Sequence, residues 1–358
     1  MKNTLDDVVI LIPSLDPDEK MPEYVKALIK AKAKHILLVD DGSKLENRHF
    51  FDELEKYKEV TILRHMVNQG KGRGLKTGLN YVLEKMPEVK GVVTADADGQ
   101  HAVDDTIACA NRLLETNKVV FGTRNFNEEI VPFKSRNGNK ITTAVFKLLY
   151  GKLVNDTQTG LRALPMDFIK ECLALPGERF EYEIAMLIKI VKDGRDIIEE
   201  PIKTIYFESN RATHFNTFKD SYRIYKIMLG TFFRFAITSV LSFIIDWGLY
   251  TILIHTIFSN NEYTKGIFLS TVIARVFSSL FNYTVNKNSV FNSKEGTKTT
   301  IVKYYILAIC QMIASWLLVT VLFGALNINS SILKIFVDFI LFIISYNIQN
   351  KWVFKDGE

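Results

Sequence analysis

This chain contains few cysteines and only a small excess of positive charge. The three cysteines, Cys109, Cys172 and Cys310, lie far apart, and their spacing matches neither a metal site nor a redox pair. The net charge is only +5 over 358 residues, which gives no reason to expect a nucleic-acid partner. We therefore expect a reduced, cytosolic environment and partners other than nucleic acids.

Two common sequence signatures are also missing. The start, Met1–Asp7, has no long apolar stretch of the kind that marks a signal peptide. We thus expect the first half to stay where it is made. The glycine-rich segment Asn68–Gly78 lacks the Gly-Lys-Ser/Thr of a P-loop and does not match the dinucleotide fingerprint.

Apolar residues are unevenly distributed along the chain. Residues 1–218 alternate polar and apolar segments, whereas residues 231–352 are dominated by Ile, Leu, Phe and Val. The length also exceeds that of one average domain. This pattern predicts a soluble domain over 1–218, a short linker over 219–230 and a membrane domain over 231–358.

The soluble part begins with the alternation of a parallel α/β sheet. Val8–Ile12 and His35–Val39 are short apolar runs typical of strands buried on both faces, and Pro13 is expected to end the first. Between them, Glu23–Lys34 has helical spacing, and a third strand follows at Val60–Leu63. Ligands of such sheets bind at the carboxyl ends of the strands.

Two carboxylates follow another expected strand, Gly91–Thr94. Because alternate residues of a strand point to the same face, Asp96 and Asp98 can converge, and Gln100 continues the alternation with a neutral oxygen. Such oxygens suit Mg²⁺ or Mn²⁺, which often bridge to substrate phosphates. The alternative is an ordinary acidic turn.

Polar groups also follow the second and third strands. Asp40 and Asp41 could accept hydrogen bonds from a base or from ribose hydroxyls, although a helix-capping turn has the same composition. Lys71 opens a glycine-rich helix that should run to about Lys85 and would favour a pyrophosphate nearby. A flexible basic loop is the alternative.

The chain resembles the family 2 glycosyltransferases, which have a GT-A fold, through four motifs that occur in this order: LIPSLD, LLVDDGS, NQGKGRGLKTGL and TADADGQH. More narrowly, residues 7–218 are similar to the polyprenyl-phosphate sugar synthases, a group whose best-known type is dolichyl-phosphate mannose synthase. This resemblance implies a Rossmann-like, mostly parallel α/β catalytic domain. It also implies that Pro13, Asp16 and Asp41 frame the nucleotide. The family usually has Tyr-Asn-Glu where this chain has Ser14-Leu15-Asp16.

The same resemblance implies that Asp96, Asp98 and Gln100 hold the metal on the donor diphosphate. On the acceptor side, arginine forks match phosphate oxygens, so Arg124 and Arg136 are candidates for the lipid phosphate, although surface arginines are common. Phe180–Glu183 resembles an acidic acceptor-side motif, and further candidates there are Arg162, Glu183 and Arg211. His214, in the segment that resembles the end of the catalytic domain, is expected to be structural.

The expected reaction needs no general base, because a lipid phosphate is already anionic. Catalysis then consists of positioning and of stabilising the departing nucleoside diphosphate, with the metal as Lewis acid. The resemblance implies a single inverting displacement from a nucleotide sugar to an undecaprenyl-phosphate-like lipid, for cell-envelope glycosylation. Asp96, Asp98, Arg124 and Arg136 are the expected catalytic residues. Alternatives are a lipid-sugar transporter that only binds the nucleotide sugar, or another lipid acceptor.

Four apolar segments can each cross a ~30 Å hydrocarbon core, at about 231–257, 265–285, 304–325 and 331–350. Three basic residues at helical spacing precede these segments: Lys219, Arg223 and Lys226. Such a helix can bind anionic lipid headgroups, and the alternative is a plain linker helix. Lysines and arginines are concentrated before the first span, between the second and third, and after the fourth. The positive-inside rule then predicts a multi-pass protein of the cell membrane with both termini and the catalytic domain in the cytosol.

The membrane part contains a repeat. Asn286–Phe291 follows the second span and Asn350–Phe354 follows the fourth, each with Asn-Lys, a spacer and Val-Phe. This resembles the GtrA family of four-helix membrane proteins, which implies lipid-linked sugar transfer and proposed flipping. Two two-span units predict a parallel repeat, although a duplicated anchor would look the same. Such a domain could also mediate self-association.

Three charged residues are expected near the bilayer midplane: Asp246, Arg275 and Asp338. Charges at that depth normally face a bundle interior and pair. We therefore expect Arg275 to meet Asp338 or Asp246 inside a four-helix bundle. The pair would be either structural or a polar station for a crossing phosphate headgroup.

Overall fold

The computed structural model describes residues 4–128, 131–203, 205, 216–257, 263–326 and 329–355. The chain forms two compact units, Met1–Met228 and Leu229–Glu358. The division falls inside one long helix, close to the end of the segment predicted to be a linker.

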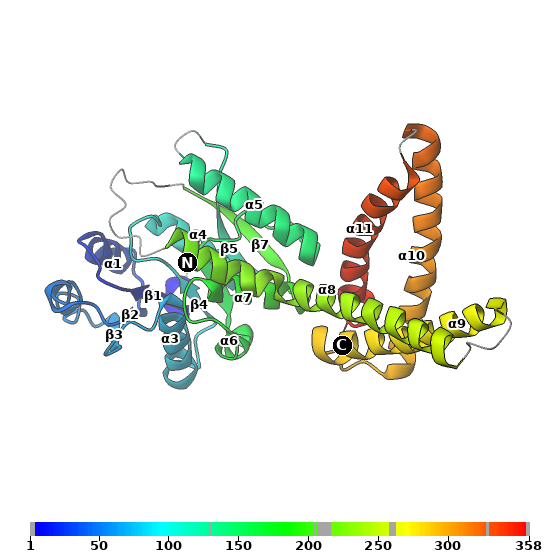
Figure 1. Ribbon diagram of the computed structural model, residues 1–358. Helices are drawn as coiled ribbons and strands as arrows, with labels where there is room; N and C mark the ends of the chain where they lie inside the picture. Colours follow the sequence, from blue (N-terminus) through cyan, green and yellow to red (C-terminus); the bar gives the residue numbers. More distant parts are fainter. Residues whose placement is uncertain are drawn as a thin grey trace. The chain divides into compact units, whose positions relative to one another are not determined.

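The first unit is built on a seven-stranded sheet in the order β3-β2-β1-β4-β6-β5-β7 (Figure 1). Its strands are β1 (Val8–Ser14), β2 (Ile36–Asp40), β3 (Val60–Arg64), β4 (Gly91–Thr94), β5 (Val119–Arg124), β6 (Arg162–Pro165) and β7 (Ile197–Ile202). Neighbours run parallel except at β6, which is antiparallel to both β4 and β5. The predicted mostly parallel α/β sheet is confirmed. Because β6 runs backwards, its beginning lies at the edge where the other strands end.

Every residue of β1 is buried, as its apolar run predicts. The strand nevertheless continues through Pro13 to Ser14, past its predicted end. The ladder with β4 stops at Leu11, whereas the ladder with β2 extends to Ser14. Pro13 therefore sits where one side of the strand has no partner, and its missing N–H removes no ladder bond.

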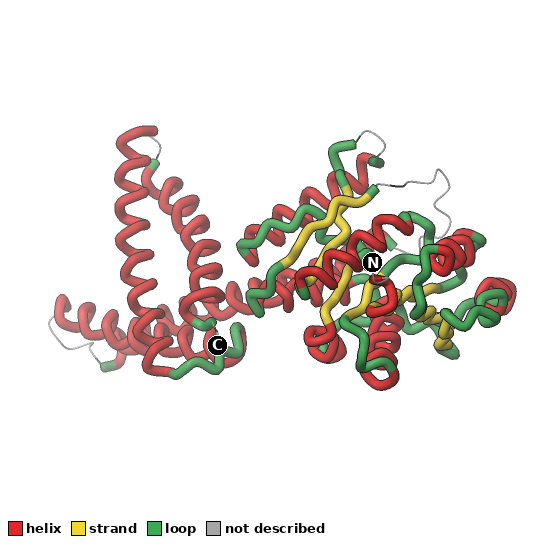
Figure 2. Tube along the Cα trace, turned by 180° about the vertical axis from the view of Figure 1, so that it is seen from behind, coloured by secondary structure: helices red, strands yellow, loops and turns green. Residues whose placement is uncertain are grey.

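Helices cover both faces of this sheet (Figures 1 and 2). In the first unit they are α1 (Lys20–Lys30), α2 (His49–Asp52), α3 (Lys71–Lys85), α4 (Val103–Thr116), α5 (Phe133–Tyr150), α6 (Met166–Leu173) and α7 (Glu181–Lys192), with short 3₁₀ turns η1 (Thr4–Asp7) and η2 (Leu45–Asn47). Side chains of α1 and α4 share a core with Ile10 and Ile12 of β1. On the opposite face, Gly78 of α3 lies against Leu11. Helix α1 ends before its predicted limit, since Lys32 takes a left-handed φ of 68°.

The predicted linker is the first part of α8 (Thr217–Thr256), with no break before the first apolar span. Ile224 and Met228 are buried, whereas Tyr222 is exposed, so this stretch is amphipathic. It is tied to α5, since the Tyr150 hydroxyl donates to the Met228 carbonyl at 2.9 Å. The segment is thus a firmly packed part of the first unit rather than a loose connection.

The second unit consists of the rest of α8 with α9 (Tyr263–Val285), α10 (Thr297–Leu326) and α11 (Ser330–Ile348). Helices α9 and α11 end in π-helical turns, η3 (Asn286–Val290) and η4 (Gln349–Val353). The described chain holds four helices long and apolar enough to cross a membrane, over Thr217–Thr256, Lys265–Val290, Thr297–Ala325 and Ser330–Val353. The four expected spans are confirmed at this level.

The π turns define the register of the repeat. In η3 the Phe291 N–H closes on the Asn286 carbonyl, and in η4 the Phe354 N–H closes on the Gln349 carbonyl, each at 2.9 Å. Asn286 is therefore equivalent to Gln349, one residue away from the Asn350 that the Asn-Lys match predicted.

Equivalent residues of the two hairpins contact each other. The Asn286 amide donates to Gln349 Oε1 at 3.3 Å, and the rings of Phe291 and Phe354 stack at 5.3 Å. Tyr283 lies 5.9 Å from Phe354, and Tyr346 lies 5.9 Å from Phe291. Reciprocal contacts of this kind define a two-fold axis. The sequence repeat thus corresponds to two hairpins that meet at equivalent residues, and its parallel arrangement about the membrane normal stays a prediction.

Candidate active site

A cavity of about 310 Å³ opens at the carboxyl edge of the sheet. Its walls come from the ends of β1, β2 and β4, from the start of α3 and from the segment before α7, through Pro13, Leu15, Asp41, Lys71, Asp96, Asp98, Arg179 and Phe180. This is the position at which parallel sheets bind ligands. The structure thus brings together Pro13, Asp41, Lys71, Asp96 and Asp98, which the sequence predicted from four separate motifs.

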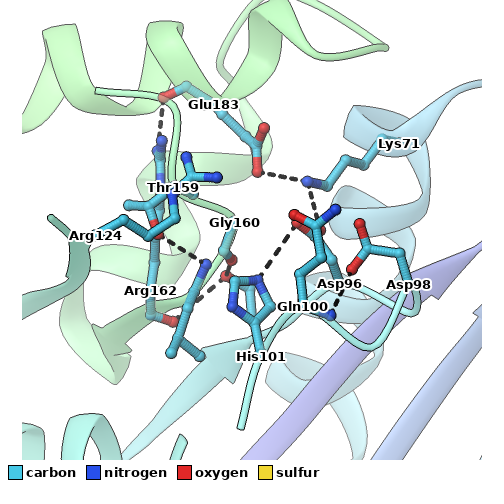
Figure 3. Close-up of polar contacts among 12 residues, drawn as sticks. Lys71, Asp96, Asp98, Gln100, His101, Arg124, Thr159, Gly160, Arg162 and Glu183 are labelled. Carbon is cyan, nitrogen blue, oxygen red and sulfur yellow. Dashed lines mark hydrogen bonds and ion pairs between the residues drawn. The ribbon is translucent and has the colours of Figure 1, made fainter. Parts of the chain in front are cut away.

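Lys71 bridges two carboxylates at the centre of this site (Figure 3). Its Nζ lies 2.6 Å from Asp96 Oδ1 and 2.9 Å from Glu183 Oε1. Burial opposes the ammonium charge, but Asp96 and Glu183 outweigh it and raise the pKa of Lys71. Burial also opposes the Asp96 charge, yet Lys71 and His101 hold the pKa of that carboxyl well below its usual range. Both groups are therefore charged at neutral pH, and Glu183 belongs to this cavity's charge network.

Asp98 is less well compensated. Its Oδ1 accepts a hydrogen bond from the Gln100 backbone N–H at 3.0 Å. Burial, and then the charge of Asp96, raise the pKa of Asp98. Nearby, the buried His101 ring makes no hydrogen bond to the described residues, although its Nε2 lies 3.4 Å from Asp96 Oδ2. An under-compensated carboxylate such as that of Asp98 fits a divalent cation.

The described residues alone do not complete a metal site. They contain no group of three or more His, Cys, Asp or Glu side chains placed to hold an ion. Two carboxylates suffice for Mg²⁺ or Mn²⁺ only if other oxygens complete the shell, and substrate phosphates commonly do so. Asp96 and Asp98 therefore fit a cation that arrives with a diphosphate. Gln100 shares their turn, and its backbone already binds Asp98.

Gly160 is a site residue that the sequence reasoning missed. A Cβ added there would lie 2.7 Å from Asp96 Cγ and closer still to Oδ2. The Gly160 carbonyl also accepts a hydrogen bond from the Thr94 hydroxyl at 2.8 Å. Only a residue without a side chain fits against the Asp96 carboxylate. The sole signal in the sequence is the glycine itself, two residues before Arg162.

Asp41 lines the cavity as predicted, but both of its carboxylate oxygens are bonded to other groups of the protein. Oδ1 accepts from the Gln69 N–H at 2.9 Å and lies 2.7 Å from His65 Nδ1, while Oδ2 accepts from the Gly70 N–H at 2.7 Å. Gly70 has a φ of 105°, which favours glycine. Asp41 and Gly70 together shape the loop that delivers Lys71.

Two predicted nucleotide ligands are placed elsewhere. Asp40 is fully buried, and its Oδ1 accepts from the Ser43 N–H at 2.8 Å. It cannot reach a bound nucleotide, so that prediction is wrong. Asp16 has a φ of 45°, and its Oδ1 accepts from the Lys44 N–H at 2.8 Å and from Asn47 Nδ2 at 3.1 Å. It therefore turns toward the loop after β2, and Pro13 and Leu15 line the cavity instead.

Arg124 lies at the end of β5 in a second cavity of about 600 Å³. Its Nε and Nη2 donate to the two oxygens of Asp156, at 2.7 and 3.1 Å, and Asp156 is fully buried. The guanidinium also lies over the Phe126 ring, 5.0 Å from its centroid. One edge of the arginine fork is thus fixed by the protein, which sets the direction of the other edge.

The remaining predicted arginines behave differently. Arg136 donates from Nη2 to the Glu128 carbonyl at 2.7 Å and lines neither of these two cavities. Arg162 is only 1% exposed, and it donates to the carbonyls of Glu183 and Thr159 at 2.6 and 2.9 Å. Its predicted contact with the acceptor is wrong, because the guanidinium is used inside the protein. Arg211 and His214 lie outside the described residues.

Comparison with known proteins identifies the family of this chain. Residues 9–172 match the model of glycosyl transferase family 2. A UDP-N-acetylglucosamine–dolichyl-phosphate N-acetylglucosaminyltransferase from Methanococcus voltae is 31% identical over 244 residues, which cover 62% of this chain and 96% of that protein. The chain belongs to glycosyltransferase family 2. An uncharacterized protein of Methanocaldococcus jannaschii is 30% identical, over 64% of this transferase and 93% of that chain.

The second unit of the transferase has its own match. Residues 234–354 match the GtrA/DPMS transmembrane domain, which confirms the resemblance of the repeat to GtrA. Among solved structures, glucosyl-3-phosphoglycerate synthase from Mycobacterium tuberculosis, in complex with Mn²⁺, UDP-glucose and phosphoglyceric acid, has a TM-score of 0.47 at 14% identity. The matched region covers 63% of this chain and 79% of the synthase.

The membrane unit of the transferase pairs its charges within each hairpin. Arg275 Nη2 lies 3.3 Å from Asp246 Oδ2, which confirms one of the two predicted pairs. Asp338 instead binds Lys334 Nζ at 2.7 Å. The Arg275 side chain is 71% exposed, so its predicted enclosure in a bundle is wrong. Arg275 and Asp338 are equivalent residues on opposite sides of the two-fold axis, so each finds a partner in its own hairpin.

Proposed function

We propose that this transferase moves a sugar from a nucleoside diphosphate to the phosphate of a polyprenyl lipid. The observation that carries the proposal is the convergence of Asp96, Asp98 and Lys71 in one cavity at the carboxyl edge of the sheet. A cavity that alternates acidic and basic groups suits a cation together with a diphosphate. The continuation of the same chain into four apolar helices supports a lipid acceptor.

In this proposal Asp96 and Asp98 hold Mg²⁺ or Mn²⁺, which when bound supplies a Lewis acid for the negative charge on the departing diphosphate. Lys71 adds a second positive group, oriented by Glu183. An oxygen of the acceptor phosphate attacks the anomeric carbon, and the bond to the nucleoside diphosphate breaks with its electron pair on the leaving group. Attack from the opposite face inverts that carbon. No proton has to be removed, so the protein's task is positioning.

Arg124 is the proposed partner of the acceptor phosphate. Asp156 binds its Nε and Nη2, so the protein fixes the orientation of the guanidinium at the end of β5 before any lipid binds. Arg136 stays a proposed second contact. By the positive-inside rule, the positive residues beside the spans support a cytosolic location for the catalytic unit and both termini. Self-association through the membrane unit stays a prediction.

The relative from Methanococcus voltae makes UDP-N-acetylglucosamine the first donor to test. Purified full-length protein would be incubated with labelled UDP- and GDP-sugars, polyprenyl phosphate and Mg²⁺ or Mn²⁺. We expect a labelled lipid from one donor class, no product with unphosphorylated polyprenol, and loss of product with EDTA. Binding of a nucleotide sugar without any lipid product would favour the transporter alternative. If the labelled product forms only with a different lipid, that lipid is the acceptor and the polyprenyl-phosphate assignment is wrong.

Replacing Arg124 by alanine should weaken the acceptor more than the donor. We expect KM for polyprenyl phosphate to rise by about tenfold or more, because a charge-assisted contact is lost, while KM for the nucleotide sugar changes by less than about twofold. Arg136→Ala should act in the same direction. Arg112→Ala is the matched control, because Arg112 is an exposed arginine of α4 paired with Glu200. An equal rise in both KM values would place Arg124 on the donor side.

A further inference from the structure

The two hairpins of the membrane unit carry opposite charges at equivalent positions. Arg275 precedes the π turn at Asn286 by eleven residues, and Asp338 precedes the π turn at Gln349 by eleven. At 1.5 Å per residue, each lies about 17 Å from its turn, near the middle of a ~30 Å hydrocarbon core. The repeat is therefore symmetric in backbone but not in charge.

Asp338 is well satisfied. Its Oδ2 accepts from Lys334 Nζ at 2.7 Å, and its Oδ1 accepts from the Ser315 hydroxyl at 2.6 Å. Lys334 also donates to Ser315 at 2.8 Å. These three side chains form a closed group in which the carboxylate has both a cation and a hydroxyl.

Arg275 is much less satisfied. A guanidinium has five N–H donors in a planar fork, and within the described residues its side chain makes one ion pair, at 3.3 Å to Asp246. Asp246 is shared, since its other oxygen accepts from the Ser278 hydroxyl at 2.9 Å. With 71% of its side chain exposed, Arg275 would present most of its donors to hydrocarbon, where unpaired donors and charges are costly.

An anion supplied by the bilayer would remove this cost. Acyl and isoprenoid chains offer no acceptor, whereas a phosphate matches the arginine fork with two parallel hydrogen bonds. We propose that Arg275 binds a lipid phosphate within the membrane unit, and that Asp246 holds the guanidinium when no lipid phosphate is present. Isoprenoid phosphates and ordinary phospholipids share this chemistry. We assign the isoprenoid phosphate, and that choice of lipid rests on the proposed function.

Native mass spectrometry of the full-length protein tests this proposal. Protein in detergent would be mixed with undecaprenyl phosphate, with undecaprenol or with phosphatidylglycerol, and bound lipids per chain would be counted. We expect two undecaprenyl phosphates on the wild type and none of the neutral undecaprenol. Arg275→Gln should lose one of the two, with affinity for that site reduced by about tenfold or more. Arg124→Ala should lose the other, so failure of the catalytic assignment is distinguishable from failure of this one.

Two further variants separate a lipid site from a structural ion pair. Asp246→Asn removes the competitor of the phosphate and should strengthen binding at the Arg275 site. Lys334→Gln is the matched control, since it breaks the ion pair of the other hairpin, and it should leave lipid binding unchanged. If Arg275→Gln and Asp246→Asn both lower the melting temperature and leave the lipid count at two, the pair is structural and the proposal is overturned. Equal binding of phosphatidylglycerol would overturn the isoprenoid assignment.

Discussion

Asp98→Asn is expected to reduce sugar transfer by about 10³-fold while the protein stays folded. Asparagine can still accept the hydrogen bond from the Gln100 N–H, but it carries no charge for a cation. Because Asp98 is an under-compensated carboxylate with a raised pKa, its removal should not lower the melting temperature. Transfer of labelled sugar to polyprenyl phosphate measures the effect.

The control for this variant is Asp104→Asn, an exposed carboxylate in the first turn of α4. It should retain full activity. Normal turnover of Asp98→Asn at saturating Mg²⁺ or Mn²⁺ would show that Asp98 is not a metal ligand.

Gly160→Ala is expected to reduce transfer by about 10²-fold, although it adds a single methyl group. The new Cβ would overlap the Asp96 carboxyl group. Asp96 must then rotate, which breaks its 2.6 Å contact with Lys71. The φ of Gly160 lies outside the left-handed region, so the backbone accepts alanine and the loss should appear in activity rather than in folding.

Transfer rate and melting temperature would be compared for Gly160→Ala and Gly138→Ala. At Gly138, in α5, an added Cβ meets nothing within 4 Å, so that variant should keep the wild-type transfer rate, and its melting temperature should equal or slightly exceed that of the wild type because alanine favours a helix. Full activity of Gly160→Ala would mean that the position of Asp96 is not critical.

Residue pattern alone predicted most of the sheet. Apolar runs such as Val8–Ile12 place strands because a central parallel strand is buried on both faces. The edge that carries the site followed from where those runs end, and Asp96, Asp98 and Lys71 are indeed gathered there. These predictions depend on local periodicity and on one rule of sheet topology.

The predictions that failed depend on contacts distant in sequence. Nothing in the residues around Arg162 shows that the carbonyl of Glu183 will take up its guanidinium. Asp40 and Asp41 are neighbours of identical chemistry, and only the direction of the strand end buries the first and turns the second to the cavity. The closeness of Gly160 to Asp96 likewise arises from the antiparallel strand β6, which has no signature of its own.

That strand has an evolutionary consequence. The short stretch before β6 holds Arg124 through Asp156 and touches Asp96 through Gly160, four residues later. It therefore acts as a spacer of fixed length between the two cavities. An insertion or deletion of one residue in this stretch would therefore disturb the contacts of Arg124 and of Asp96 together. Among homologues, changes of length here should accompany a change in the whole reaction rather than in one substrate.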